Sequence, residues 1–446
     1  MSHKVVNWSE LATDPLNKLS LEIIEEGLKA SNPYSSVLQT LSKFSKQIGK
    51  YSNIIVIGFG KASYSMALAC EDHFGNRFSG GAIIVPKGSI KGSALKKIEV
   101  LEGTHPVPTE INVSSVRKVL LYVNGLSEDD LVICLISGGG SALLTLPAEG
   151  ITLQDKQEMT KILLAAGPTI QEINCIRKHI SAVKGGQLAK AIYPAHVLSL
   201  ILSDVVGDDL SSIASGPTAP DPSTFKDVLN LLERYRILEQ VPHNIRNRIH
   251  LGLEGKVAET PKPNDKVFEN VTNVIVANNM KALTSMANKA ESAGLKTMIL
   301  TSYLEGEARE VGKVIGAIAR QIAKENLPLK PPCAIFFGGE TTVTLRGKGK
   351  GGRNQEVALS TSIAIRGLPN VNFVSLGSDG VDGNSDAAGA IVNGSTFQKA
   401  LEKGLSPTNY LENNDSNTFF KEVGGLIITG PTGTNVNDLS FLIVFP

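Results

Sequence analysis

Short apolar runs and longer amphipathic segments alternate along the first half of the chain. Residues 11–50 carry apolar side chains at helical spacing, as in LSLEIIEEGLKA. The apolar run at 53–57 predicts a buried strand, and the glycines that follow it lead into another helical segment. Similar runs occur in GAIIVP, DLVICLIS and HVLSLILSD, with helical patterns between them. Strands that alternate with helices predict a parallel α/β sheet covered on both faces.

The pattern changes in the second half of the chain. Residues 208–270 hold six prolines between helical stretches, and we interpret them as a connector with helices of its own. Strand and helix patterns then resume, and CAIFFGGETTVTLRG alternates as a hairpin strand does. The fold class is therefore α/β with two domains. We predict a larger Rossmann-like parallel domain over 1–270 and a smaller mixed α/β domain over 271–446.

Composition and charge argue against some classes of binding partner. The 446 residues include 44 basic and 43 acidic side chains, and the formal net charge of +1 predicts no binding to nucleic acid or to an anionic membrane surface. The N-terminus lacks the apolar core of a signal peptide, and no apolar run has the length of a membrane span. The four cysteines form no Cys-x-x-Cys pair, so we expect reduced thiols in a cytoplasmic protein. The sequence leaves open whether the chain forms a homo-oligomer.

Two glycine-rich loops follow predicted strands and carry the residue types of a phosphate site. In the first loop Lys61 comes directly after Gly58 and Gly60, although the spacing fails the Walker A pattern and a tight turn with a solvated lysine is the alternative. The second loop is a run of three glycines between two serines: Ser137, Gly138, Gly139, Gly140 and Ser141. Backbone N–H groups in such a run can form a nest around a phosphate. Ligands bind at the carboxyl ends of strands in open α/β sheets, so we expect the site at these loops.

A basic cluster and an acidic loop add two further candidates. Arg177, Lys178 and Lys184 are three cations within eight residues of a nearly neutral protein. Such a group favours binding of a carboxylate or phosphate, with a solvated helix face as the alternative. Asp204 stands at the end of a predicted strand, in SDVVGDD. A carboxylate in that position commonly holds Mg²⁺ or accepts a proton from a hydroxyl group.

The C-terminal half carries a third group of polar loops. The glycine-rich segment 347–352 contains two lysines and ends in Arg353 and Asn354 at a predicted helix start. This arrangement favours phosphate binding, with a mobile surface loop as the alternative. Three carboxylates in the neighbouring loops are candidate ligands of Mg²⁺: Glu340, Asp379 and Asp382. Asx turns are the alternative role for the acidic loops.

Taken together, these loops resemble the glycerate 2-kinase family of the archaeal and bacterial type, whose C-terminal half is called the MOFRL domain. The matching stretches, in order, are GFGKAS, THPVP, LISGGGSALL, INCIRKHISAVKGGQLA, LSDVVGDDLSSIASGPTAPDP, FFGGETTVTLRGKGKGGRNQE and SLGSDGVDGNSDAAGA, over residues 58–390. Several motifs in one order are far more specific than any one of them. The resemblance implies two α/β domains and an enzyme that uses ATP and Mg²⁺ to phosphorylate D-glycerate, giving 2-phosphoglycerate and ADP.

The resemblance also implies roles for particular residues. Phosphoryl transfer needs positioning and neutralisation of charge, and we assign this task to Lys61 and Arg353. Asp204 is the candidate that orients or deprotonates the attacking hydroxyl group. The substrate carboxylate is expected to meet Arg177, Lys178 or the backbone of the triple-glycine loop.

Two other functions are weighed against the kinase. A hydroxypyruvate reductase would need a complete dinucleotide fingerprint with an acidic residue about 20 positions further on, and the sequence has neither. A non-enzymatic protein that binds an organic acid would gain nothing from the paired acidic loops. Incubation with D-glycerate and either ATP or NADH separates the three.

Overall fold

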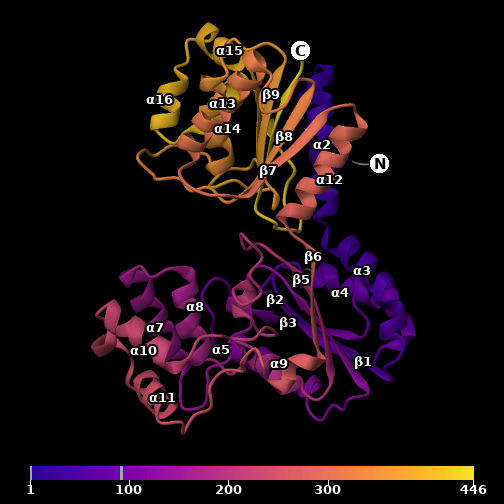
Figure 1. Ribbon diagram of the computed structural model, residues 1–446, viewed down its shortest axis with the longest axis vertical. Helices are drawn as coiled ribbons and strands as arrows, with labels where there is room; N and C mark the ends of the chain where they lie inside the picture. The colour runs from indigo at the N-terminus through magenta and orange to yellow at the C-terminus, as the bar shows by residue number, and fades with distance from the viewer. Residues whose placement is uncertain (1–2, 91–93) are drawn as a thin grey trace. The chain divides into compact units, whose positions relative to one another are not determined.

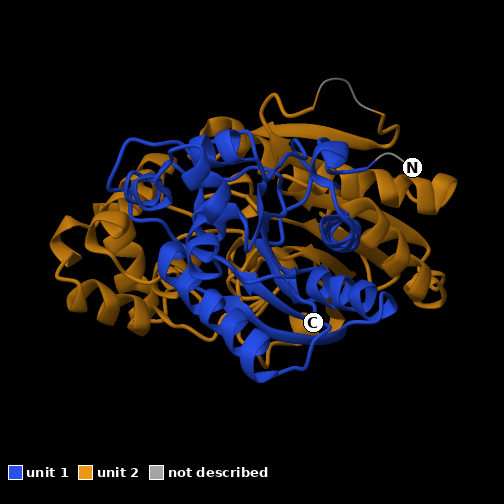
Figure 2. Ribbon diagram, turned by 90° about the horizontal axis from the view of Figure 1, so that it is seen from above, with its two compact units in different colours: residues 1–32, 277–446 blue, residues 33–276 orange. Residues whose placement is uncertain are grey.

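The computed structural model describes residues 3–90 and 94–446, and its internal contacts divide the chain into two compact units (Figure 2). One unit consists of residues 33–276, and the other joins residues 1–32 to residues 277–446. The predicted boundary near residue 270 lies close to the observed one. The assignment of 1–270 to a single domain is wrong at its N-terminal end, because the first 32 residues belong to the C-terminal unit.

The unit over 33–276 holds a parallel sheet with helices on both faces (Figure 1). In chain order its elements are α3 (Pro33–Ile48), β1 (Asn53–Phe59), α4 (Ser63–Phe74), η1 (Gly75–Arg77), β2 (Gly80–Pro86), β3 (Ile98–Gly103), α5 (Glu110–Tyr122), β4 (Asp130–Ile136), α6 (Gly140–Leu143), α7 (Leu153–Ala166), α8 (Ile170–His179), α9 (Gln187–Ile192), β5 (His196–Leu202), η2 (Ile213–Ser215), α10 (Phe225–Arg234), η3 (Leu238–Gln240), α11 (His243–Leu253), η4 (Lys266–Asn270) and β6 (Val271–Ala277).

The strand order in this sheet is β3-β2-β1-β4-β5-β6 within the described residues. Strands β1 to β5 pair in parallel, which confirms the predicted Rossmann-like arrangement. The central strands β1 and β4 are almost continuously buried, as expected for strands covered on both faces. Strand β6 completes this sheet, so the prediction that residues from 271 onward belong to the C-terminal domain is wrong for that strand.

The proline-rich segment is a helical layer rather than a loose connector. Helices α10 and α11 share a hydrophobic core with α7 and α8, which includes Phe225, Leu232 and Ile245. A threonine directly precedes each of α7, α8 and α10, and its side chain takes part in a capping box. The prolines therefore separate short, well-defined helices that pack as one body.

The second unit contains a mixed sheet in the order β11-β10-β9-β12-β8-β7 within the described residues. Its elements are α1 (Trp8–Leu11), α2 (Pro15–Ala30), α12 (Asn279–Ser292), β7 (Lys296–Leu304), α13 (Ala308–Glu325), β8 (Cys333–Gly339), α14 (Arg353–Ala364), β9 (Val371–Gly377), β10 (Gly389–Asn393), α15 (Thr396–Glu402), α16 (Pro407–Glu412), α17 (Ser416–Val423), β11 (Leu426–Ile427) and β12 (Asp438–Val444).

The C-terminal strand explains why this sheet is mixed. Strand β12 runs antiparallel between β8 and β9, and β7 pairs in parallel with β8. Helices α13 and α14 share a core with the sheet, while α2 and α12 pack on each other and against its strands (Figure 1). The expected hairpin after residue 333 does not form, because only β8 is a strand and the chain then leaves the sheet.

The N-terminal segment is held in this unit by close packing and by long-range hydrogen bonds. Gly27 of α2 faces Met286 of α12, where a Cβ atom would lie 2.6 Å from the methionine sulfur. The backbone N–H of Val6 donates to the carbonyl oxygen of Ile428, 2.7 Å away. The early amphipathic pattern predicts a helix correctly, but it carries no information on which sheet that helix covers. None of the described helices combines the length and the apolarity needed to cross a membrane.

Replacement of Gly27 by valine tests this placement. We expect Gly27→Val to destabilise the C-terminal unit by about 1–3 kcal/mol, because the added methyl groups overlap Met286 in a filled interface. Hydrogen exchange should increase first in α12 and in the strands of residues 277–446. Lys18→Val, on the exposed face of the same helix, is the matched control and should leave exchange unchanged. Faster exchange confined to residues 33–276 would contradict the placement.

Candidate active site

The parallel register brings several loops to one edge of the first sheet. Phe59, the last residue of β1, pairs with Ile84 on one side and with Ile136 on the other. Ile136 in turn pairs with Ile201 of β5. The loops that begin at Gly60, Ser137 and Ser203 therefore start side by side, as expected for the carboxyl ends of parallel strands.

Glycine residues, which have no side chain, allow these loops to approach each other closely. A Cβ atom on Gly138 would lie 2.2 Å from Oδ2 of Asp204, so only glycine leaves room for that carboxylate. The position of a Cβ atom on Gly139 lies 3.2 Å from the His105 ring and 3.4 Å from Cγ of Lys61. The triple-glycine run thus brings together Asp204, Lys61 and His105, which are far apart in the sequence.

The backbone N–H groups of these loops are partly used to join the loops to each other. The N–H of Lys61 donates to the carbonyl oxygen of Gly138, and the N–H of Ala62 donates to Oγ of Ser137. The N–H of Gly140 donates to the carbonyl oxygen of Ser137. These three groups hold the loops in place, and of them only the N–H of Gly140 belongs to the triple-glycine run, so a phosphate nest at that run stays a prediction. The Lys61 side chain remains exposed beside the loops.

Two glycines of the first loop have packing roles. Gly58 lies inside β1, where a Cβ atom would come within 2.9 Å of Cβ of Leu135. A Cβ atom on Gly60 would lie 2.2 Å from Oγ of Ser137. Both glycines therefore allow close packing within the site, and direct contact with a phosphate remains a prediction for each.

A cavity of about 400 Å³ adjoins these loops within residues 33–276. Gly139, Ser141 and His105 line it, together with side chains from α7 and α8. Two of the predicted cations, Arg177 and Lys184, also line this cavity. The ammonium group of Lys184 donates to the carbonyl oxygen of Ser141 at 2.7 Å and lies 3.0 Å from its hydroxyl oxygen.

Burial lowers the pKa values of the cations in this cavity, and for the two lysines repulsion by neighbouring cations adds to the effect. Lys156 of α7, which sequence reasoning missed, lines the same cavity and is 8% exposed. Desolvation, and then repulsion by Arg177, lower its pKa from 10.5 to about 7. Desolvation, followed by the charges of Lys156 and Arg177, holds the pKa of Lys184 well below its usual value. Burial also lowers the pKa of Arg177.

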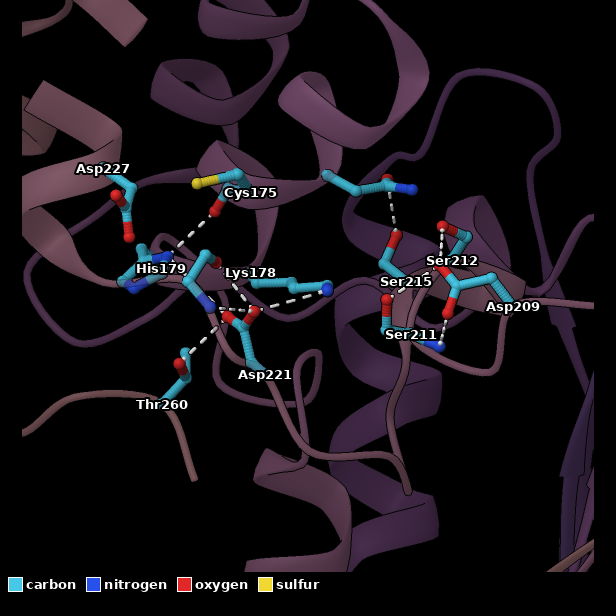
Figure 3. A network of polar contacts seen from close by, with 12 residues as sticks. Cys175, Lys178, His179, Asp209, Ser211, Ser212, Ser215, Asp221, Asp227 and Thr260 are labelled. Atoms are coloured by element: carbon cyan, nitrogen blue, oxygen red, sulfur yellow. Dashed lines mark hydrogen bonds and ion pairs between the residues drawn. The ribbon is translucent and has the colours of Figure 1, made fainter. Parts of the chain in front are cut away.

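Lys178 has a different role from its neighbour Arg177. Its ammonium group lies 3.4 Å from Oδ1 of Asp221, and both side chains are buried (Figure 3). Thr260 donates a hydrogen bond to the other oxygen of the same carboxylate. Lys178 therefore joins α8 to the proline-rich segment. Lys178 is not among the residues that line the cavity, so its predicted contact with the substrate carboxylate gains no support from its position.

The second unit holds Arg353 in a fixed orientation at the start of α14. Its Nε and Nη2 atoms donate to the two carboxylate oxygens of Asp438, at 2.7 and 3.0 Å. Its Nη1 atom donates to Glu340 at 2.8 Å. These bonds use three of the five N–H groups of a guanidinium. Burial raises the pKa of Asp438 to about 6, although the charge of Arg353 opposes this shift.

Asn354 and Asp382 form a buried polar network behind Arg353. The two oxygens of Asp382 accept hydrogen bonds from the backbone and side-chain amides of Asn354 and Gln355, at 2.9 to 3.3 Å. Asn354 also donates to Asp438 and accepts from Ser375. The N-terminus of α14 is thereby capped by a carboxylate. Both residues position the helix that carries Arg353, and contact of Asn354 with a phosphate remains a prediction.

The three candidate metal ligands do not form a cluster. Asp382 is engaged with α14, and Oδ1 of Asp379 accepts a hydrogen bond from the Val381 backbone. Glu340 is exposed and bonded to Arg353. Across residues 3–90 and 94–446, no group of three or more His, Cys, Asp and Glu side chains is arranged to hold a metal ion.

Sequence reasoning missed two residues of these sites. Asp438 directly precedes the last apolar run, and a carboxylate at a strand end is a signal that could have been used. Lys156 has no such signal, because its neighbours in LQDKQEM are polar or helix-forming and predict a solvated face.

The fold and the site define a two-unit α/β protein with a cationic cavity beside the strand ends of its parallel sheet. Residues 19–250 match the family described as a domain of unknown function, DUF4147, and residues 333–438 match the MOFRL family. A glycerate 2-kinase from Pyrococcus horikoshii is 44% identical, over 96% of this chain and 97% of that protein. A putative hydroxypyruvate reductase from Agrobacterium vitis is 38% identical, over 98% of this chain and 96% of that protein.

The crystal structure of a glycerate kinase from Thermotoga maritima has the same fold. It superimposes with a TM-score of 0.88 at 40% identity, and the match covers 96% of this chain and 99% of that chain. The chain belongs to the glycerate kinase family with a C-terminal MOFRL domain. The resemblance inferred from the sequence motifs is therefore confirmed.

The contrast between Lys178 and Arg177 can be tested by stability. We expect Lys178→Met to lower the free energy of unfolding by about 3–5 kcal/mol, because it leaves the Asp221 carboxylate buried without its partner. The matched variant Arg177→Met should keep or raise stability, since Arg177 has no ion pair within the described residues. Urea unfolding at pH 7 measures both. An Arg177→Met variant that is the less stable of the two would reverse these roles.

Proposed function

We propose that this chain is an ATP-dependent kinase that phosphorylates D-glycerate at its 2-hydroxyl group, giving 2-phosphoglycerate and ADP. The observation that carries this proposal is the convergence of family motifs at one edge of the parallel sheet. GFGKAS, THPVP and LISGGGSALL meet there, and Asp204 lies against the last of them. The family relationship over nearly the full chain supports the same reaction.

The reaction transfers a phosphoryl group between two oxygen atoms. The 2-hydroxyl oxygen of glycerate forms a bond to the γ-phosphorus of ATP, and the bond from that phosphorus to the leaving ADP oxygen breaks. The hydroxyl proton passes to Asp204 or to solvent. The charge on the moving group requires neutralisation. We assign this task to Lys61 and Arg353, because each is a positively charged residue in or next to a glycine-rich loop.

A magnesium ion fits this proposal as a companion of the nucleotide. Mg²⁺ usually keeps several waters and is held by one or two carboxylates together with phosphate oxygens, so a protein cluster of three ligands is not required. Glu340 and Asp379 are the carboxylates we propose for this role, since Asp382 is committed to α14. When bound, the ion would neutralise charge on the phosphates.

A reductase is the second function considered, because one relative carries that name. A dinucleotide site places an acidic residue at the end of the second strand, where it binds the ribose. Here β2 ends at Pro86 and continues into Lys87 and Gly88. This chain therefore lacks, after its second strand, the acidic residue that nicotinamide binding would use.

We also propose that the enzyme works in the cytoplasm, where its four buried, free cysteines would stay reduced.

A coupled assay tests the proposed reaction. Purified protein with D-glycerate, ATP and Mg²⁺ should form a product that enolase consumes directly, with no phosphoglycerate mutase added. Excess chelator should stop the reaction, and added Mg²⁺ should restore it. A requirement for the mutase would mean that the 3-hydroxyl group is phosphorylated. Oxidation of NADH with hydroxypyruvate, without kinase activity, would favour the reductase.

Substitution of the two proposed cations tests their assignment. Lys61→Met and Arg353→Lys should each lower kcat by about 100-fold or more, because the charge on the transferred group loses a correctly placed partner. Lysine at position 353 keeps a charge near Asp438, so the fold is expected to survive. Lys226→Met and Lys324→Met, at exposed helix positions, are the controls. Near-normal turnover in both site variants, with native circular dichroism, would refute the assignment.

A further inference from the structure

The ammonium group of Lys156 is buried without a hydrogen-bond partner. Its Nζ atom is one of the few buried polar atoms among the described residues that lack one. The Lys156 side chain belongs to the lining of the 400 Å³ cavity beside the triple-glycine loop. A buried ammonium group without a partner lowers the stability of a protein, so its position needs a physical explanation.

The cavity that Lys156 lines has positive, neutral polar and apolar side chains and no carboxylate among its described lining residues. Arg177 and Lys184 line the same cavity. The remaining charged or titratable groups of the lining are Lys161, which is exposed, and His105. The Arg177 side chain makes no hydrogen bond or ion pair within the described residues. Among those residues the Lys184 ammonium group bonds to Ser141 alone, so it has no counter-charge either.

Part of the cavity wall is apolar. Pro108 and Ile180 line the same cavity as the three cations, and the exposed side chain of Leu164 adds apolar surface to the lining. An anion that enters such a site interacts more strongly with fixed charges than it would in water. Arginine can grip a carboxylate with two parallel hydrogen bonds, and a lysine supplies a point charge from another direction. A bound anion would supply the missing negative charge and would oppose the lowering of the pKa values of Lys156 and Lys184.

We propose that Lys156, Arg177 and Lys184 form one pocket for the carboxylate of the organic-acid substrate, with Lys156 as a binding residue. This inference deepens the proposed function, because it rests on an acid such as glycerate being the acceptor. His105 and Gly139 line the cavity and also lie next to Lys61. A carboxylate held by the three cations would therefore keep the substrate hydroxyl groups near the loops that we assign to phosphoryl transfer.

The test compares the wild-type chain with Lys156→Met. Methionine fills similar space without a charge, so the variant should unfold at a temperature higher by about 2 °C or more. Its Kd and KM for D-glycerate should rise at least about tenfold, while the KM for ATP stays within about twofold. Lys190→Met, at an exposed position of α9, is the control and should change none of these values. Calorimetry with D-glycerate and with glycerol, which has no carboxylate, measures the binding directly.

The outcomes separate this pocket from the proposed kinase function. If D-glycerate does not bind but malonate does, and Lys156→Met abolishes that binding, the carboxylate pocket stands and the glycerate kinase function fails. If D-glycerate binds both proteins with equal affinity, the pocket assignment is wrong even where kinase activity is normal. A rise in the unfolding temperature of the wild type with inorganic phosphate, and none with any carboxylate, would also overturn the assignment of a carboxylate pocket. A destabilised Lys156→Met variant with unchanged affinity would show that Lys156 is structural.

Discussion

Burial of both faces of each sheet is the constraint on which this structure depends. Strands such as β4, β8 and β12 are apolar along most of their length, and the charged residues of β4 and β12, Asp130 and Asp438, stand at the first position of each strand. Polar chemistry is therefore confined to the strand ends and to the loops that begin there. In the first unit the parallel register aligns those ends at one edge, so loops from four separate segments come together.

The surroundings of Arg353 and of Lys156 differ in how buried charge is compensated. Arg353 is paired with the carboxylates of Asp438 and Glu340, and the nearby carboxylate of Asp382 accepts hydrogen bonds from amides of α14. Around Lys156 the cations have no carboxylate beside them. A paired group is held rigidly and keeps its orientation, whereas an unpaired group is ready to bind a ligand of opposite charge. The first arrangement orients a residue, and the second is suited to hold an anion.

The kind of structure and the motif loops could be predicted because they depend on local patterns. Apolar runs followed by glycines indicate buried strands and tight turns, and these predictions are confirmed for β1 and β4. Lys178 and Arg177 show where such reasoning stops. They are neighbours in one basic run, yet one is paired with Asp221 and the other faces the cavity. Adjacent helical residues point about 100° apart, and the sequence does not state what lies in either direction.

By itself, the sequence determined the α/β class, the order of the strand-end loops and the family to which the chain belongs. Those properties follow from periodicity and from motifs that are contiguous along the chain. Only the tertiary structure decided that α2 packs in the C-terminal unit, that Asp438 orients Arg353, and that Lys156 is buried among other cations. Each of these depends on contacts between segments distant in sequence. Burial and charge pairing arise only when those segments pack together, so no local pattern encodes them.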